Sequence, residues 1–177
     1  GCCLRDKREI HEEDIVVYFC QHCRETIENK VKTMSLWEYI DSLEDFEFPD
    51  FNHEKMLLQD CYRDRNQPEV HQAVRSILQK MNVDVVEAKR NKENSIYCGT
   101  LHYETEDHAL LEKLKAYPDT KISELPLELQ KELMEDNFKG VDLDMQIIVD
   151  CNRCLKGVEL AGRKGIHLLN LVMKNYL

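Results

Sequence analysis

A pattern that occurs twice constrains the fold of this chain more than any other feature. A short apolar run is followed at once by a Cys-x2-Cys pair, then by a short helical segment and a second apolar segment. The first copy reads IVVYFCQHCRETIENKVKTMSLWEYI from Ile15, and the second reads IIVDCNRCLKGVELAGRKGIHLLNLV from Ile147. Two copies of one arrangement favour a duplicated α/β unit over coincidence.

The apolar runs predict strands that end close to the cysteines. Ile15–Phe19 is a continuous β-branched and aromatic run, which is typical of a strand buried on both faces in a parallel sheet. Met145–Val149 is the corresponding run before the second pair. Each Cys-x2-Cys pair is thus expected at the carboxyl end of a strand, just before a helix. Open α/β sheets place their sites at that edge.

Two further cysteines are expected at element ends in the stretch between the copies. The sequence predicts a strand from Met56 that ends on Cys61, a helix over 70–81 and a strand over 83–86. A loop then carries Cys98. We therefore expect four thiolates to converge on one point, those of Cys61, Cys98, Cys151 and Cys154.

The pattern also divides the chain into two cysteine-rich repeats. Residues 1–54 hold a partial first repeat, in which Ser35 is expected to cap an amphipathic helix over 36–43. Residues 55–177 hold the second repeat, interrupted at about 104–138 by an acidic, leucine-rich segment that predicts inserted helices. The predicted fold class is α/β, with pseudo-duplicated Rossmann-like units, a largely parallel sheet and a helical insertion, packed as one compact unit.

Composition narrows the class of protein. The 177 residues carry a formal net charge of −10, and phosphate backbones require a basic patch, so nucleic acid is not an expected partner. No apolar run is long enough to cross a bilayer and no signal peptide opens the chain, so a cytoplasmic protein without a membrane span is expected. Because thiols stay reduced in the cytosol, the eight cysteines indicate metal or redox chemistry rather than disulfides.

Converging thiolates are soft donors that suit either an iron–sulfur cluster or Zn²⁺, and the residue types leave both metals open. Candidates for a second site of the same kind are Cys2, Cys3, Cys20 and Cys23. The sequence contains no glycine-rich phosphate loop, no nucleophile elbow and no Ser-His-Asp order. No catalytic residues are therefore assigned, and neither a hydrolase nor a nucleotide enzyme is supported.

These motifs resemble the cysteine-rich CCG domain family, found in heterodisulfide reductase and in the iron–sulfur subunits of lactate and glycolate oxidation. Gln59-Asp60-Cys61 is similar to the family's first cysteine element. Ile96-Tyr97-Cys98-Gly99 is similar to its Cys-Cys-Gly, and the pair Cys151-x2-Cys154 to its closing Cys-x2-Cys.

The resemblance covers residues 15–100 and 145–172, because Cys20-x2-Cys23 resembles the closing pair of a preceding repeat. The chain departs from the family at Tyr97, which stands where the family has the first Cys of Cys-Cys-Gly. The fifth cysteine that the resemblance implies for a noncubane cluster is thus not available, and four ligands remain.

The resemblance implies a 4Fe-4S iron–sulfur cluster on Cys61, Cys98, Cys151 and Cys154. It also implies electron transfer within an oxidoreductase of the heterodisulfide reductase type or to a thiol or disulfide partner. Whether the chain is itself an enzyme stays open; if it is, an oxidoreductase subunit is expected. The alternative is a zinc-stabilised structural or protein-interaction domain without redox activity. The expected partner is a redox protein or subunit, and a homo-oligomer is left open.

Overall fold

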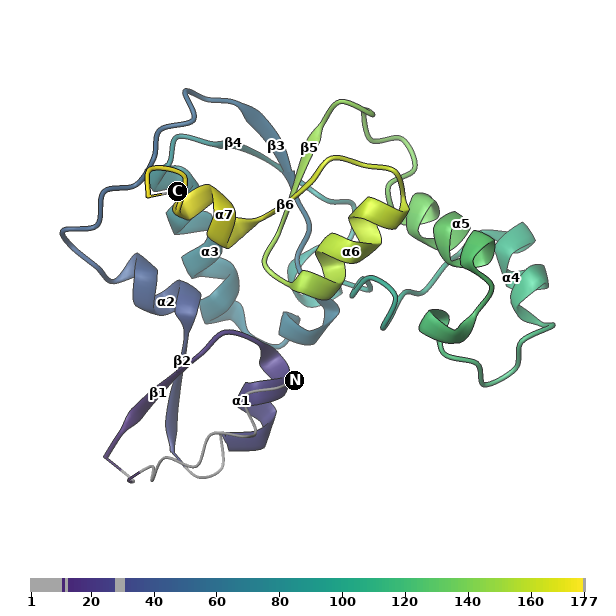
Figure 1. The fold of residues 1–177 in the computed structure, drawn as a ribbon, viewed down its shortest axis with the longest axis horizontal. Coiled ribbons are helices and arrows are strands. Elements are labelled where there is room, and N and C mark those ends of the chain that lie inside the picture. Colours follow the sequence, from purple (N-terminus) through teal and green to yellow (C-terminus); the bar gives the residue numbers. More distant parts are fainter. Residues whose placement is uncertain (1–10, 12, 28–30, 177) are drawn as a thin grey trace.

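The computed structural model in Figure 1 describes every residue except 1–10, 12, 28–30 and 177. Strands and helices alternate along most of the described chain. The elements are β1 (Ile15–Tyr18), α1 (Gln21–Ile27), β2 (Lys32–Ser35), α2 (Leu36–Asp41), β3 (Lys55–Leu58), α3 (Pro68–Lys80), β4 (Asp84–Glu87), α4 (His108–Leu114), α5 (Leu127–Asn137), β5 (Gln146–Val149), α6 (Asn152–Leu160), β6 (Gly165–His167) and α7 (Leu168–Val172). The strand expected to end on Cys61 ends at Leu58, so Cys61 lies in the loop that follows it.

Strands β4, β3, β5 and β6 form a four-stranded sheet in that order, and all their pairings are parallel. At its centre, Leu57 of β3 pairs with Val86 of β4 on one side and with Ile147 of β5 on the other. Strands β1 and β2 form a separate parallel pair. The α/β class with parallel sheets, which the apolar runs predict, is confirmed.

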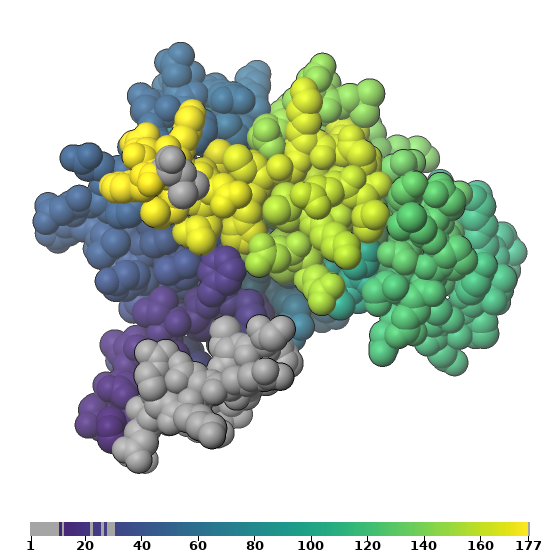
Figure 2. All heavy atoms as spheres, viewed as in Figure 1, coloured from purple at the N-terminus to yellow at the C-terminus, as the bar shows by residue number. Residues whose placement is uncertain are grey.

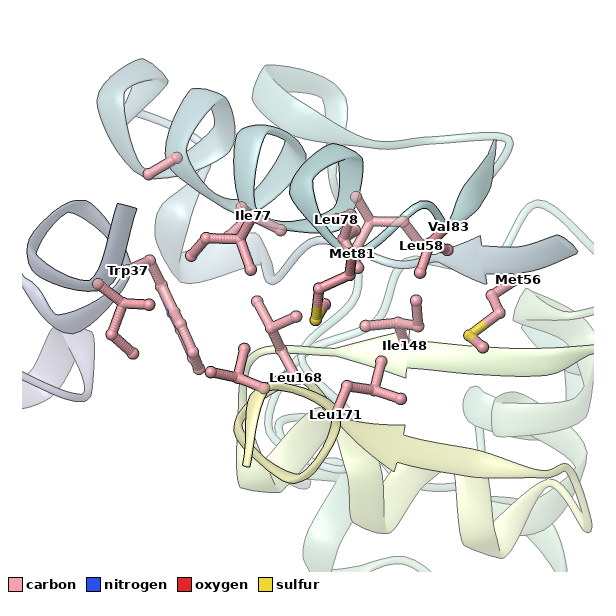
Figure 3. Packing of buried hydrophobic residues seen from close by; sticks show 14 of the residues in the cluster. Trp37, Met56, Leu58, Ile77, Leu78, Met81, Val83, Ile148, Leu168 and Leu171 are labelled. Carbon is pink, nitrogen blue, oxygen red and sulfur yellow. The ribbon is translucent and has the colours of Figure 1, made fainter. Parts of the chain in front are cut away.

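Two hydrophobic clusters lie on the two faces of the four-stranded sheet, because successive side chains of a strand point to opposite faces. Met56 and Leu58 of β3 contribute to the cluster shared with α2, α3 and α7. Leu57, between them, contributes to the cluster shared with α5 and α6. Figure 3 shows Ile148 of β5 and Leu168 of α7 packed beneath α3 in the first cluster. Helices therefore cover the sheet on both faces, as a central parallel sheet requires.

The chain leaves the two central strands toward opposite faces. After β3 it enters α3 on one face of the sheet, and after β5 it enters α6 on the other. Because β3 and β5 are neighbours, their carboxyl ends border the kind of crevice at which open α/β sheets bind ligands. Cys61 follows β3 and Cys151 follows β5, so both residues flank this crevice.

The first four elements, from β1 to α2, are called the first unit below. They follow the same order as the last four elements of the chain, from β5 to α7. The series β1–α1–β2–α2 corresponds to β5–α6–β6–α7, and each series contains a parallel strand pair. Tyr18 pairs with Ser35 just as Val149 pairs with His167. Ser35 caps α2 as predicted, since its hydroxyl accepts the Glu38 N–H, and the His167 side chain caps α7. The duplicated pattern thus corresponds to a duplicated order of elements, while the division at residues 54 and 55 stays a prediction.

The expectation that Ile15–Phe19 is a strand buried on both faces is wrong. The side chain of Ile15 is 53% exposed and that of Val17 is 41% exposed, although Tyr18 is buried. The physical reason is that β1 pairs with β2 outside the four-stranded sheet, in which two helical layers bury β3 and β5. A continuous apolar run thus predicts the strand correctly but not its surroundings.

The predicted helical insertion is present as α4 and α5, which form the green part at the right of Figures 1 and 2. Asp107 caps α4, because its carboxylate accepts the N–H groups of Ala109 and Leu110. On α5, Leu133 and Met134 are buried in the second hydrophobic cluster, to which α6 also contributes. The inserted helices are therefore part of the hydrophobic core on one face of the four-stranded sheet.

Candidate metal centre

The structure brings together the four cysteines that the sequence predicts to converge. Cys61 follows β3, Cys98 lies in the long connection after β4, and Cys151 and Cys154 stand at the start of α6. Their four sulfur atoms lie within 4.8 Å of one another, and the Sγ atoms of Cys61 and Cys98 are 3.3 Å apart. Cys61, Cys98 and Cys154 are buried, whereas Cys151 is partly exposed. The four residues are thus placed where they could hold a metal ion.

A close backbone approach brings Cys98 to the other thiols. Gly99 has a φ of +52°, a left-handed conformation that favours glycine. A Cβ atom on Gly99 would overlap the carbonyl oxygen of Arg153 and would lie 2.8 Å from its carbonyl carbon. Only a residue without a side chain therefore lets the Cys98 loop touch the turn between Cys151 and Cys154.

Tyr97 belongs to the core of the centre and not to the wall of a pocket. Its ring is fully buried, and its hydroxyl donates a hydrogen bond to the Cys154 carbonyl at 3.1 Å. Its own carbonyl accepts the Tyr62 N–H at 2.8 Å. A Cβ on Gly157 of α6 would overlap the Tyr97 hydroxyl, so the helix has a glycine where the ring meets it. The aromatic ring of Tyr97 therefore ties the Cys98 loop to α6.

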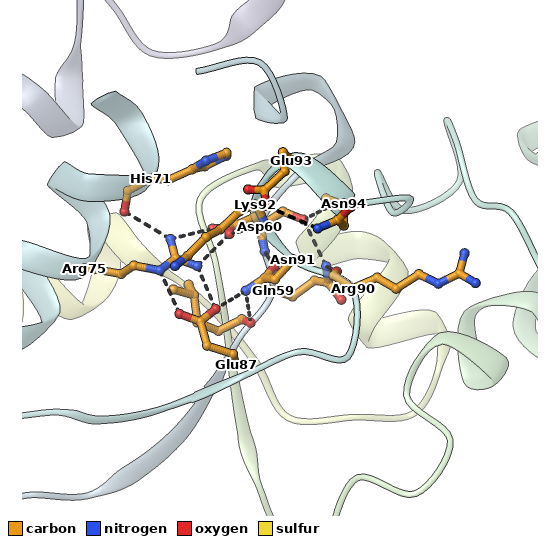
Figure 4. Close-up of polar contacts among 12 residues, drawn as sticks. Gln59, Asp60, His71, Arg75, Glu87, Arg90, Asn91, Lys92, Glu93 and Asn94 are labelled. Carbon is orange, nitrogen blue, oxygen red and sulfur yellow. Dashed lines mark hydrogen bonds and ion pairs between the residues drawn. The ribbon is translucent and has the colours of Figure 1, made fainter. Parts of the chain in front are cut away.

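An ion-pair network around the buried carboxylate of Asp60 holds the residue before Cys61 (Figure 4). The Nη2 atom of Arg75 on α3 lies 2.7 Å from an Asp60 carboxylate oxygen and 2.7 Å from a Glu87 carboxylate oxygen. The side chain of Asp60 is only 3% exposed. Its carboxylate also accepts the backbone N–H of Lys92 at 2.9 Å. The network thus joins α3, β4 and the loop after β4 at the end of β3.

The backbone of Asp60 also forms hydrogen bonds with the loop that follows β4. Its N–H donates to the side-chain oxygen of Asn91, and its carbonyl accepts the Ser95 hydroxyl at 2.8 Å. The Asn91 amide in turn donates to the Leu58 carbonyl at 2.9 Å. Since this loop leads into Cys98, the contacts of Asp60 fix the two thiols of Cys61 and Cys98 relative to each other.

The lowered pKa of His71, which lies on α3 near Arg75, makes the free energy of unfolding depend on pH. Burial lowers the pKa of His71 below its usual value, and its Nε2 atom has no hydrogen-bond partner among the described residues. Below about pH 6.5 the unfolded chain binds a proton at this site that the folded chain binds less readily, so the contribution of His71 to the free energy of unfolding falls with decreasing pH. We expect His71→Gln to reduce this loss between pH 7.5 and 5.5, measured by urea denaturation.

The matched control for this prediction is His108→Gln, since His108 is exposed. This variant should retain the pH dependence of the unchanged protein. An unaltered slope in His71→Gln would show that other groups cause the acid destabilisation.

The thiols of the metal centre do not ionise alike. The pKa of Cys151 is held far below its usual range, because the thiols of Cys154, Cys61 and Cys98 and the Cys154 N–H donate hydrogen bonds to its sulfur. The pKa of Cys61 is raised well above its usual value, chiefly by its hydrogen bond to Cys151. Burial raises the pKa of Cys154. A bound metal would therefore have to displace the protons of Cys61 and Cys154, whose pKa values are raised.

The centre opens onto a pocket of about 540 Å³. Cys61, Cys98 and Cys151 line the pocket, so three of the four thiols border it. Phe19 and Trp37 of the first unit also line it, and their ring centroids are 6.1 Å apart. The pocket therefore lies between the first unit and the carboxyl ends of β3 and β5.

Two buried carboxyl groups also line the pocket, and they are site residues that sequence analysis missed. Burial raises the pKa of Asp64 to about 7 and that of Asp150 well above its usual value. The Oδ1 atom of Asp150 is buried without a hydrogen-bond partner among the described residues. A buried polar atom that lacks a partner costs free energy, so the pair indicates a functional position. The only signal in the sequence is that Asp150 directly precedes Cys151.

The residues present fit a soft metal ion or cluster. Four sulfur donors, three of them buried, make a donor set typical of zinc and of iron–sulfur centres. The other predicted site is only partly described. Cys20 and Cys23 have their Sγ atoms 3.3 Å apart, whereas Cys2 and Cys3 lie outside the described residues.

With this geometry established, we compared the chain with known proteins. No family model, no curated protein and no solved structure matches it. Among the helices that the structure describes, none has the length and apolar character needed to cross a membrane.

Proposed function

We propose that this chain is a metal-binding redox module, in which Cys61, Cys98, Cys151 and Cys154 hold an iron–sulfur cluster. The observation that carries the proposal is the pocket beside the thiols, lined by three of them. A purely structural metal site is normally closed by its four ligands, whereas a site that reacts or exchanges electrons needs an approach from outside. When bound, such a cluster supplies one-electron chemistry.

The pocket supports this reading in a second way. In a cluster the four thiolates bind different iron atoms, so the sulfurs must lie farther apart than around a single ion. Cys61, Cys98 and Cys151 border free space of about 540 Å³, into which their side chains can move. The protein residues would then ligate the iron atoms, exclude water from the inner side and leave the pocket side accessible.

Zinc is the second candidate, and the spacing of the sulfurs favours it. A tetrahedral zinc site has Zn–S bonds of about 2.3 Å, so its sulfurs lie about 3.8 Å apart. All four sulfurs here lie within 4.8 Å of one another, which a single ion fits with little movement. In that case the metal would stabilise the fold, and the acidic chain would serve as a binding module.

The resemblance to the CCG domain family supports the redox proposal without depending on the pocket. It would make the chain a module of an oxidoreductase of the heterodisulfide reductase type, with a redox protein, a subunit or a thiol or disulfide compound as its partner. Because Tyr97 is a core residue with no thiol to offer, the centre has four cysteine ligands. We therefore propose conventional electron transfer rather than chemistry at a five-cysteine cluster.

The deciding experiment is the metal and acid-labile sulfide content of protein purified without air, together with its visible spectrum. We expect iron and sulfide in near-equal amounts and broad visible absorption. Both should be lost in Cys98→Ser and kept in the matched control Cys20→Ser, whose thiol lies outside the four. One zinc per chain without sulfide would replace the redox proposal by the structural one. The absence of any metal would contradict both.

A further inference from the structure

The first unit presents a dithiol pair of its own. Cys20 lies between β1 and α1, and Cys23 lies near the start of α1, the strand–helix position at which redox-active Cys-x2-Cys pairs occur in α/β proteins. Their Sγ atoms are 3.3 Å apart, and a disulfide bond requires about 2.05 Å. A small side-chain rotation thus joins the two sulfurs.

The two thiols differ in accessibility as the members of an exchange pair do. Cys20 is exposed and Cys23 is buried, with only 8% of its surface accessible. In thiol–disulfide exchange one accessible thiol attacks the substrate, and a protected neighbour resolves the mixed disulfide. Cys20 therefore has the exposure of an attacking thiol, and Cys23 that of a resolving thiol.

The position of the pair connects it to the metal centre. Cys20 lines the same pocket as Cys61, Cys98 and Cys151. Gln21, the next residue, also lines this pocket, as does Asp64. A small molecule or peptide in the pocket can thus touch Cys20 and Cys151, the partly exposed thiol of the metal centre, at once.

We propose that Cys20 and Cys23 form a reversible dithiol–disulfide pair that opens onto the pocket of the metal centre and reacts with disulfides. The Cys20 sulfur attacks a substrate disulfide, which forms a mixed disulfide and releases one thiol. The Cys23 sulfur then attacks Cys20, which forms the Cys20–Cys23 disulfide and releases the second thiol. The substrate gains two electrons and two protons, and the pair loses them. The exchange reaction uses only these two thiols and the substrate disulfide, so it does not rest on the proposed function of the metal centre.

The test uses the full chain and glutathione disulfide as the probe, with peptide mapping by mass spectrometry after alkylation of the remaining thiols. We expect the unchanged protein to form the Cys20–Cys23 disulfide. The Cys23→Ser variant cannot resolve the mixed disulfide, so it should retain a glutathione adduct on Cys20. This adduct should be at least about ten times as abundant as in the unchanged protein, which resolves it. The matched control Cys20→Ser/Cys23→Ser, which keeps the cysteines of the metal centre, should carry no adduct at this position.

A further variant separates this proposal from the one on the metal centre. In Cys98→Ser, which should lack the metal, the Cys20–Cys23 disulfide should still form. Failure of disulfide formation in the unchanged protein together with no adduct in Cys23→Ser would overturn the proposal. So would a second metal per chain that Cys20→Ser removes, because it would assign Cys20 and Cys23 to a second metal site.

Discussion

Replacing Gly99 with alanine is expected to abolish metal binding and to lower the free energy of unfolding by about 3 kcal/mol. The residue has a φ of +52°, and an added Cβ would overlap the Arg153 carbonyl. The Cys98 loop would have to withdraw from the turn between Cys151 and Cys154, so the four sulfurs could no longer meet at one point. Metal content of the purified variant and urea denaturation measure the two effects.

The matched control is Gly140→Ala. Gly140 also has a positive φ, of +84°, but a Cβ there would meet nothing within 4 Å. This variant carries the conformational cost of about 1 kcal/mol without the collision, and it should keep its metal. Equal losses in the two variants would show that backbone conformation, and not the contact with Arg153, is what matters at Gly99.

The convergence of Cys61 with Cys151 and Cys154 could be predicted because it follows from topology, whereas Cys98 joins them through a loop that Gly99 lets approach α6. Parallel strands have their carboxyl ends at one edge of a sheet, so residues that follow β3 and β5 meet there whatever the length of the connection between them. The inserted helices add to the core on one face of the sheet and leave this edge unchanged. The capping role of Ser35 could also be predicted from neighbouring residues alone, because a helix cap depends only on the helix that it begins.

The pocket could not be predicted, because its walls come from distant parts of the chain. Trp37 joins the cluster of α3 and α7, and its ring stands 6.0 Å from that of His167. This long-range packing places Phe19 and Cys20 opposite the metal centre. For the same reason the exposure of Ile15 was mispredicted, since an apolar run does not reveal which sheet it joins.

The ion pair between Asp60 and Arg75 could not be predicted from the sequence either, for a different reason. Asp60 and its partner Arg75 lie on different elements, and each has nearer residues of opposite charge along the chain. Burial decides that Asp60 pairs with Arg75 in the folded protein. A carboxylate removed from water is stable only when a well-placed cation and further hydrogen bonds offset the loss of its hydration. The carboxylate of Asp60 accepts hydrogen bonds from Arg75 and from the Lys92 N–H, and its backbone carbonyl accepts one from the Ser95 hydroxyl.

Replacing Arg75 with methionine is therefore expected to lower the free energy of unfolding by about 3 kcal/mol, because it leaves the carboxylate of Asp60 buried without its cation. Lys164→Met, which breaks the exposed pair with Asp144, should change stability by at most about 1 kcal/mol. Urea denaturation of both variants gives the comparison.

The Arg75→Met variant should also bind its metal more weakly, since Asp60 holds the loop that leads to Cys98 next to Cys61. The measurement is the rate of metal loss to a chelator under conditions in which the variant is folded. Loss at the rate of the unchanged protein would show that the network stabilises the fold without positioning the thiols. Faster loss in Arg75→Met but not in Lys164→Met would link the ion pair to the geometry of the metal centre, because the two variants remove the same charge from different places.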